Sequence, residues 1–176
     1  VRESASQMVQ ALQSKGLGVG SRIAIISTNR PEVLSNIAAM QLNGCIGTPL
    51  HPLGSVDDHA YVLEAAEIET LIFDTSVFTE LAEALKQRVP TLKNLLGFGP
   101  SEVGDDYLAL AASFEPKPLV APDVSPDDIA SVNFTGGTTG ISKGVPHNHA
   151  KVIAAIELIE DRWPTDLGTD ILLNVP

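Results

Sequence analysis

Residues 71–98, with the sequence LIFDTSVFTELAEALKQRVPTLKNLLGF, decide the fold class of this chain. The apolar run Leu71–Phe73 predicts a buried strand, and Leu95–Phe98 predicts a second one. A helix with a Thr75–Ser76 start and a stop at Pro90 is predicted between them by apolar residues at i, i+3, i+4 and i+7: Phe78, Leu81, Ala82 and Leu85. Two strands joined by such a helix imply a crossover connection and parallel pairing.

The same alternation of strands and helices extends along the rest of the chain. Further strands are predicted at Ile23–Ile26, Ile46–Leu50, Ile129–Phe134 and Ile171–Val175. Helical stripes precede or separate them, and the last stripe, which Pro164 ends, consists of Val152, Ile156, Ile159 and Trp163. The sequence therefore predicts an α/β fold with a Rossmann-like, mostly parallel sheet and helices on both faces.

The chain divides into two blocks at a proline-rich segment. We expect an α/β subdomain at residues 1–113 and an extended surface connector at 114–126. Residues 127–176 would add a strand, a glycine-rich loop, a helix and a strand. Because the chain opens without an initiator methionine and ends in a strand, we expect it to be a fragment of a longer protein.

Composition narrows the possible partners. The chain has 11 Lys and Arg against 22 Asp and Glu, so its formal charge is −11. This charge argues against a nucleic-acid-binding protein. The longest apolar run, Tyr107–Ala112, is far shorter than the roughly 18 residues of a membrane span, and no signal-peptide pattern opens the chain. We therefore expect a soluble, cytoplasmic protein. Cys45 is the single cysteine, so neither an internal disulfide nor a multi-thiolate metal site can form.

The chemistry is predicted to lie in the loop TGGTTGISKG at residues 135–144. Its glycines let successive N–H groups point into one concavity, its threonines supply hydroxyl donors and its lysine supplies a positive charge. An ordinary surface turn does not need this composition, and the Walker spacing is absent, so the pattern favours a polyphosphate cradle of another kind. The predicted binding residues are Thr135, Gly136, Gly137, Thr138, Thr139, Gly140 and Lys143.

This loop resembles the signature phosphate loop of the adenylate-forming (ANL, AMP-binding) superfamily, which includes acyl-CoA synthetases. Three further segments resemble that family in the same order: Gly18–Ile25, Thr48–Pro52 and Leu71–Asp74. The form Thr-Gly-Gly-Thr-Thr-Gly is similar to that of bacterial fatty-acyl-CoA ligases. Two positions differ from the commonest signature, because Gly136 stands where many members have Ser and Ser142 where many have Pro. The loss of proline's fixed φ at 142 is expected to loosen the loop.

The resemblance implies a ligase in which a fatty acid, ATP and coenzyme A give acyl-CoA, AMP and pyrophosphate through an acyl-adenylate. It also implies Mg²⁺, small-molecule substrates (ATP, a carboxylic acid and coenzyme A), and a loop that holds the β- and γ-phosphates, with Lys143 acting as a point charge. The family's magnesium-binding Glu and catalytic lysine would lie beyond Pro176, so no catalytic residue is assigned and the fragment alone is expected to be inactive. An aryl-CoA ligase, a fatty-acyl-AMP ligase and a non-catalytic nucleotide-binding module remain alternatives.

The other polar candidates are interpreted structurally, and no metal site is predicted. His147 and His149 supply too few ligands for a metal, and His51 and His59 are interpreted as surface or capping histidines. Cys45 is expected to be a small buried thiol. The carboxylate pairs Asp57–Asp58 and Asp127–Asp128 are assigned to a helix start and to a solvated approach to a strand.

Overall fold

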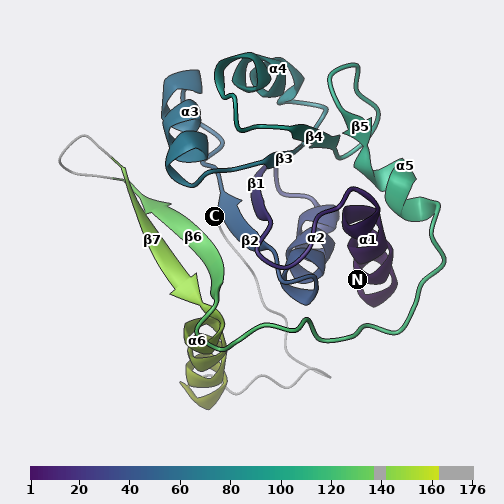
Figure 1. Cartoon of the computed structure of the whole chain (residues 1–176), viewed down its shortest axis with the longest axis vertical. Helices are drawn as coiled ribbons and strands as arrows, with labels where there is room; N and C mark the ends of the chain where they lie inside the picture. Colours follow the sequence, from purple (N-terminus) through teal and green to yellow (C-terminus); the bar gives the residue numbers. More distant parts are fainter. Residues whose placement is uncertain (137–141, 163–176) are drawn as a thin grey trace.

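The computed structural model describes residues 1–136 and 142–162, and Figure 1 shows its elements. Within these residues the helices are α1 (Arg2–Ser14), α2 (Pro31–Leu42), α3 (Val56–Ala65), α4 (Thr79–Arg88), α5 (Tyr107–Ala112) and α6 (His149–Arg162). The strands are β1 (Arg22–Ile26), β2 (Ile46–Pro49), β3 (Thr70–Phe73), β4 (Asn94–Gly97), β5 (Asp105–Asp106), β6 (Ile129–Thr135) and β7 (Lys143–Asn148). The predicted strand at Ile171–Val175, and Trp163 and Pro164, lie outside the described residues.

All of these strands form a seven-stranded sheet in the order β5-β4-β3-β1-β2-β6-β7. Pairing is parallel from β5 to β6, and the edge strand β7 runs antiparallel to β6. The predicted mostly parallel α/β fold is confirmed. Parallel pairing places the carboxyl ends of β1, β2, β3, β4 and β6 along the same edge of the sheet.

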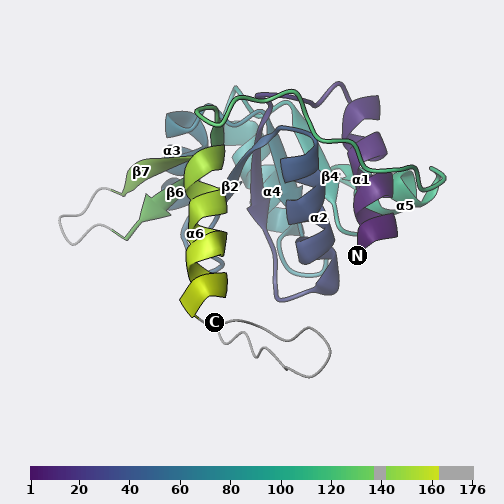
Figure 2. The same ribbon diagram turned by 90° about the horizontal axis from the view of Figure 1, so that it is seen from below.

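Two hydrophobic clusters cover the two faces of the sheet. Side chains alternate along β1, so that Ala24 and Ile26 join one cluster while Ile23 faces the other. The first cluster packs α3 and α4 against the sheet, and the second packs α1, α2 and α5. Figures 1 and 2 show this arrangement, with α1 and α2 on one side of the sheet and α3 and α4 on the other. The prediction of helices on both faces is therefore correct.

The start of α3 follows the predicted capping box. The Ser55 hydroxyl accepts a hydrogen bond from the Asp58 N–H at 3.1 Å, and the Asp58 carboxylate accepts one from the Ser55 N–H at 3.0 Å. These reciprocal bonds satisfy two of the donors that a helix N-terminus leaves open. The paired carboxylate at 57–58 is thus a helix-start feature, as predicted.

The predicted start of the next helix is wrong. The helix α4 begins at Thr79, and Thr75 and Ser76 precede it. The Ser76 hydroxyl donates instead to the Asp74 carboxylate at 2.7 Å, which engages the side chain that would have capped the helix. The helix α5 is not predicted from the sequence, because its run at 107–112 is apolar throughout and has no polar face to mark an amphipathic helix.

The segment at 114–126 contains no helix or strand and runs beside α1. The Gln7 side chain donates to the Phe114 carbonyl at 2.8 Å, and the Ser6 hydroxyl donates to the Lys117 carbonyl at 2.7 Å. Hydrogen bonds from α1 therefore hold the segment that leads to β6.

Two apolar side chains of the stripe on α6 are exposed in the described part of the chain. Ile156 is 54% exposed and Ile159 is 55% exposed. An apolar stripe at helical spacing usually marks a buried face, but in the described part of α6 these side chains are exposed. No helix within residues 1–136 and 142–162 has both the length and the apolar character needed to cross a membrane.

Candidate functional site

The two described ends of the predicted phosphate loop are held together by backbone pairing. Thr135 ends β6, Lys143 begins β7, and the two residues lie opposite each other in the antiparallel ladder. The Ser142 hydroxyl adds a hydrogen bond of 2.6 Å to the Thr135 carbonyl. Serine at 142 is therefore hydrogen-bonded across the base of the loop. The expectation of a looser loop concerns residues 137–141, which lie outside the described residues.

The loop leaves the sheet at the edge where parallel strands end. Its strand β6 pairs with β2, which ends at Pro49, and Figure 1 shows the β6–β7 hairpin projecting from the body of the molecule. Open α/β sheets bind ligands outside the carboxyl ends of their strands. The position of Thr135 and Lys143 therefore agrees with a ligand-binding role. Gly137, Thr138, Thr139 and Gly140 lie outside the described residues.

Of the predicted binding residues, the structure describes Thr135, Gly136 and Lys143. Lys143 is exposed, and no carboxylate in the described part of the chain forms an ion pair with it. A Cβ at Gly136 would have no atom of the described residues within 4 Å. The Thr135 hydroxyl lies 3.5 Å from the Lys143 carbonyl, at the long limit for a hydrogen bond.

A cavity of about 770 Å³ lies beside the base of the loop. It is bounded by the residues that follow β2, by the first turns of α3 and by the stem of the hairpin. Its described lining consists of Pro49, Leu50, His51, Pro52, Gly54, Asp57, Asp58, His59, Tyr61, Val62, Phe134, Gly136 and Ser142. The predicted phosphate loop therefore borders a hollow that is large enough for part of a small-molecule ligand.

His59 in this cavity is buried, and its interpretation as a surface or capping histidine is wrong. The side chain is 2% exposed, and its Nε2 has no hydrogen-bond partner among the described residues. Burial lowers its pKa, against an opposing effect of the neighbouring Asp58 carboxylate. A Cβ at Gly54 would lie 2.6 Å from Cε1 of His59, so the ring fits against a bare backbone. The helical spacing from His59 to Leu63 was the available signal for burial.

Tyr61 is a residue of the site that sequence reasoning missed. Its hydroxyl donates to the Ser142 carbonyl at 3.1 Å. Its ring meets Phe134 edge to face, with ring centroids 6.4 Å apart and an interplanar angle of 86°. No local pattern could identify this contact, because 81 positions of sequence separate Tyr61 from Ser142.

A buried polar cluster lies at the carboxyl ends of β1 and β3. The Asp74 carboxylate accepts hydrogen bonds from Thr28 at 2.6 Å, Ser76 at 2.7 Å and Arg30 at 2.8 Å. Burial disfavours the charged carboxylate, but these hydrogen bonds outweigh it and lower the pKa of Asp74 to about 2. The Arg30 guanidinium also lies 5.6 Å above the centre of the Phe98 ring. This cluster fixes the loops after two central strands.

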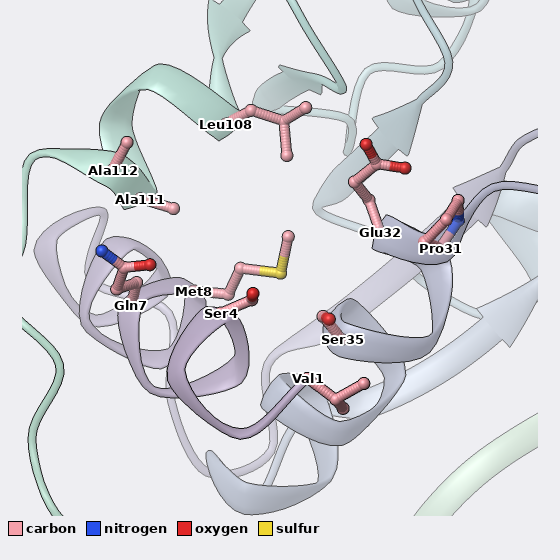
Figure 3. Close-up of a pocket in the computed structure, with 10 residues that line it drawn as sticks. All are labelled: Val1, Ser4, Gln7, Met8, Pro31, Glu32, Ser35, Leu108, Ala111 and Ala112. Carbon is pink, nitrogen blue, oxygen red and sulfur yellow. The ribbon is translucent and has the colours of Figure 1, made fainter.

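A second cavity, of about 400 Å³, lies between α1, α2 and α5. Figure 3 shows side chains from all three helices lining it, among them Met8, Ser35 and Leu108. None of the predicted phosphate-binding residues that the structure describes lies there. We therefore assign the site to the loop edge of the sheet.

Two further candidates are the Cys45 thiol and the carboxylate pair at 127–128. Cys45 is fully buried as predicted, and burial raises its pKa to about 11. Within residues 1–136 and 142–162, no group of three or more His, Cys, Asp or Glu residues is placed to hold a metal ion. The pair at 127–128 forms local bonds to Ser125 before β6 begins.

Comparisons with known proteins identify the family. A sequence profile described as AMP-binding enzyme matches residues 1–176. The chain is 43% identical over 169 residues to the medium/long-chain-fatty-acid–CoA ligase FadD8 of Mycobacterium tuberculosis, and the match covers 92% of the chain and 30% of that protein. The chain thus spans less than a third of the length of this relative.

Two solved structures share the fold. The anthranilate CoA ligase AuaEII in complex with anthranoyl-AMP has a TM-score of 0.80 at 24% identity, covering 92% of this chain and 30% of that one. ATP-bound MatB of Rhodopseudomonas palustris has a TM-score of 0.76 at 26% identity, covering 92% and 31%. Together with the profile that matches its whole length, these likenesses show that the chain belongs to the AMP-binding enzyme family, the adenylate-forming superfamily that its loop resembles.

Proposed function

We propose that the full-length protein containing this chain is an ATP-dependent acyl-CoA ligase that acts on a medium- or long-chain fatty acid. The observation that carries this proposal is the 43% identity to FadD8 over 169 residues. Because the chain spans 30% of that relative, the proposal concerns the complete protein, and the fragment alone is expected to be inactive.

The loop would hold the tail of ATP. In this proposal, the β- and γ-phosphates are bound by Thr135, Gly136, Gly137, Thr138, Thr139, Gly140 and Lys143. The described stem supports the assignment, because it keeps Thr135 and Lys143 opposite each other at the ligand-binding edge of the sheet. The exposed Lys143 ammonium group can approach a phosphate, since no described carboxylate pairs with it.

The loop would act on the first of two steps. A carboxylate oxygen of the acid attacks the α-phosphorus of ATP, a P–O bond forms, and the bond to the departing pyrophosphate breaks. Negative charge then grows on the leaving group. Backbone N–H groups, threonine hydroxyls and one ammonium group offset this charge by fixed hydrogen bonds and a point charge, without proton transfer by Lys143.

The second step needs coenzyme A, whose thiol would displace AMP from the acyl-adenylate. Mg²⁺ supplies further charge neutralisation on the phosphates when bound. Within the described residues no carboxylate cluster fits a metal ion, so protein ligands for Mg²⁺ are expected in another part of the full-length protein. In this proposal the loop at 135–144 binds the phosphates, and the metal and thiol sites lie in other segments of the full-length protein.

The test is an assay of the full-length protein with MgATP, coenzyme A and a panel of medium-chain, long-chain and aromatic acids. We expect pyrophosphate release that depends on a fatty acid, together with stoichiometric acyl-CoA. Release with aromatic acids alone would indicate an aryl-CoA ligase, and acyl-adenylate without acyl-CoA would indicate an acyl-AMP ligase. No release with any acid would favour a non-catalytic nucleotide-binding module.

A further inference from the structure

The contact between Tyr61 and the stem of the hairpin joins two elements that are distant in the sequence. Of the side-chain hydrogen bonds within the described residues, the one from Tyr61 links the hairpin stem to α3. The Tyr61 ring also packs edge to face on Phe134, at the opposite side of the stem. One side chain on α3 therefore contacts β6 and the residue that immediately precedes β7.

The helix that presents Tyr61 is firmly placed. The capping box fixes its first turn, and Leu63 is fully buried in the cluster between α3, α4 and the sheet. Phe134 packs against the same cluster. Tyr61 itself is 42% exposed, so its hydroxyl projects from a fixed helix toward the loop rather than into the core.

The acceptor of this hydrogen bond is next to the predicted phosphate-binding cation. The Ser142 carbonyl and the Lys143 N–H belong to one planar peptide unit, so a bond that fixes the carbonyl also fixes the direction of that N–H. The Ser142 hydroxyl donates a hydrogen bond to the Thr135 carbonyl on the other side of the loop. Ser142 is therefore held through its side chain as well as through its carbonyl. The start of β7 is therefore oriented by two bonds at Ser142, one of which comes from α3.

We infer that Tyr61 is a positioning residue for the phosphate loop, holding the Ser142–Lys143 peptide so that Lys143 is directed toward the polyphosphate of ATP. This inference rests on the proposed function. Tyr61 contacts the loop stem and not the reacting atoms, so it acts through Ser142 and Lys143. Its hydroxyl contributes the orientation, and its ring contributes the packing on Phe134.

The chain contains a matched control in its other tyrosine. The Tyr107 hydroxyl also donates to a backbone carbonyl, that of Met8 at 3.3 Å, but Tyr107 lies in the cluster on the opposite face of the sheet. Tyr61→Phe and Tyr107→Phe each remove one hydroxyl and keep the ring. A difference in activity between the two variants therefore depends on where the lost hydrogen bond lies, since the group removed is the same.

The experiment measures acid-dependent pyrophosphate release by the full-length protein while ATP and acid are varied separately. We expect Tyr61→Phe to lower kcat/KM for ATP about threefold to tenfold, the range for one lost neutral hydrogen bond, and to leave the KM of the acid unchanged. Tyr107→Phe should leave both values at the unsubstituted level. Tyr61→Leu, which also removes the packing on Phe134, should lower kcat/KM for ATP further.

Three results would overturn the inference in distinguishable ways. An unchanged kcat/KM for ATP in Tyr61→Phe would remove Tyr61 from the loop's function while the ligase proposal stood. Equal losses in Tyr61→Phe and Tyr107→Phe, or equal losses for ATP and acid, would indicate a general structural effect. If the unsubstituted protein released no pyrophosphate with any acid, the proposed function and the role of Tyr61 would fall together.

Discussion

The guanidinium of Arg30 lies 2.8 Å from the carboxylate of Asp74, whose side chain is 1% exposed. The pair joins the loop after β1 to the loop after β3, two adjacent strands of the sheet. A buried carboxylate is stable only when hydrogen bonds replace its lost hydration, and here Thr28 and Ser76 complete the set. The cluster therefore stabilises the edge of the sheet from which the phosphate loop also extends.

Asp74→Asn is expected to destabilise the folded state by about 2 kcal/mol, because it removes a charge whose pKa in the folded protein is lowered to about 2. Thermal unfolding of the full-length protein measures the change. Asp105→Asn is the control, since Asp105 forms an ion pair with Lys15 but is 60% exposed, and exposed pairs contribute little. Equal shifts for the two variants would contradict the special role of Asp74.

The same carboxylate predicts a pH dependence. Because the pKa of Asp74 is lower in the folded state than its ordinary value of 3.8, its contribution is fully present above about pH 4 and is lost as the pH falls toward about 2. The stability difference between the unsubstituted protein and Asp74→Asn should therefore shrink across this range. Unfolding measured from about pH 6 downward tests this, and a difference that grew on acidification would contradict the assigned direction.

Gly54→Ala is expected to destabilise the protein by about 1 to 3 kcal/mol, because the added Cβ would lie 2.6 Å from Cε1 of the buried His59. Gly18→Ala is the matched control, since its Cβ would have no atom of the described part of the chain within 4 Å. Comparison of the two unfolding temperatures gives the result. A Gly54→Ala protein as stable as Gly18→Ala would mean that the His59 ring has room to move away.

Cys45 is expected to resist alkylation in the folded protein. It is fully buried, and burial raises its pKa to about 11, so the reactive thiolate is scarce near neutral pH. Treatment with iodoacetamide followed by peptide mapping should show Cys45 unmodified in buffer and modified after denaturation in urea. Rapid labelling of this cysteine without denaturant would show that the region around it opens readily.

The sequence predicted the regular parts of this fold because their signals are local. The periodic apolar residues of 71–98 and the Ser55–Asp58 capping box depend on neighbours within a few positions, and both features are present, apart from the first turn of α4. That turn was misplaced because Ser76 bonds to Asp74 rather than capping the helix. The burial of His59 was missed because a polar residue was assumed to face water.

The site was predictable only in part, for a related physical reason. The composition of residues 135–144 and a family resemblance indicated the phosphate loop, and the structure places its described ends at the carboxyl edge of the sheet. The Tyr61–Ser142 contact and the Arg30–Asp74 pair join residues 81 and 44 positions apart. Contacts at such separations depend on how the helices pack on the sheet, which no local pattern contains.

In the proposed function, the loop at 135–144 binds the polyphosphate of ATP, and Lys143 supplies the positive charge. The most direct measurement compares kcat/KM for ATP in acid-dependent pyrophosphate release by the unsubstituted full-length protein, Lys143→Ala and Lys151→Ala. Lys151 is also exposed, on α6, and controls for the loss of one positive charge near the hairpin. We predict a loss of about 100-fold in Lys143→Ala and little change in Lys151→Ala. Equal kcat/KM values for Lys143→Ala and the unsubstituted protein would contradict the claim.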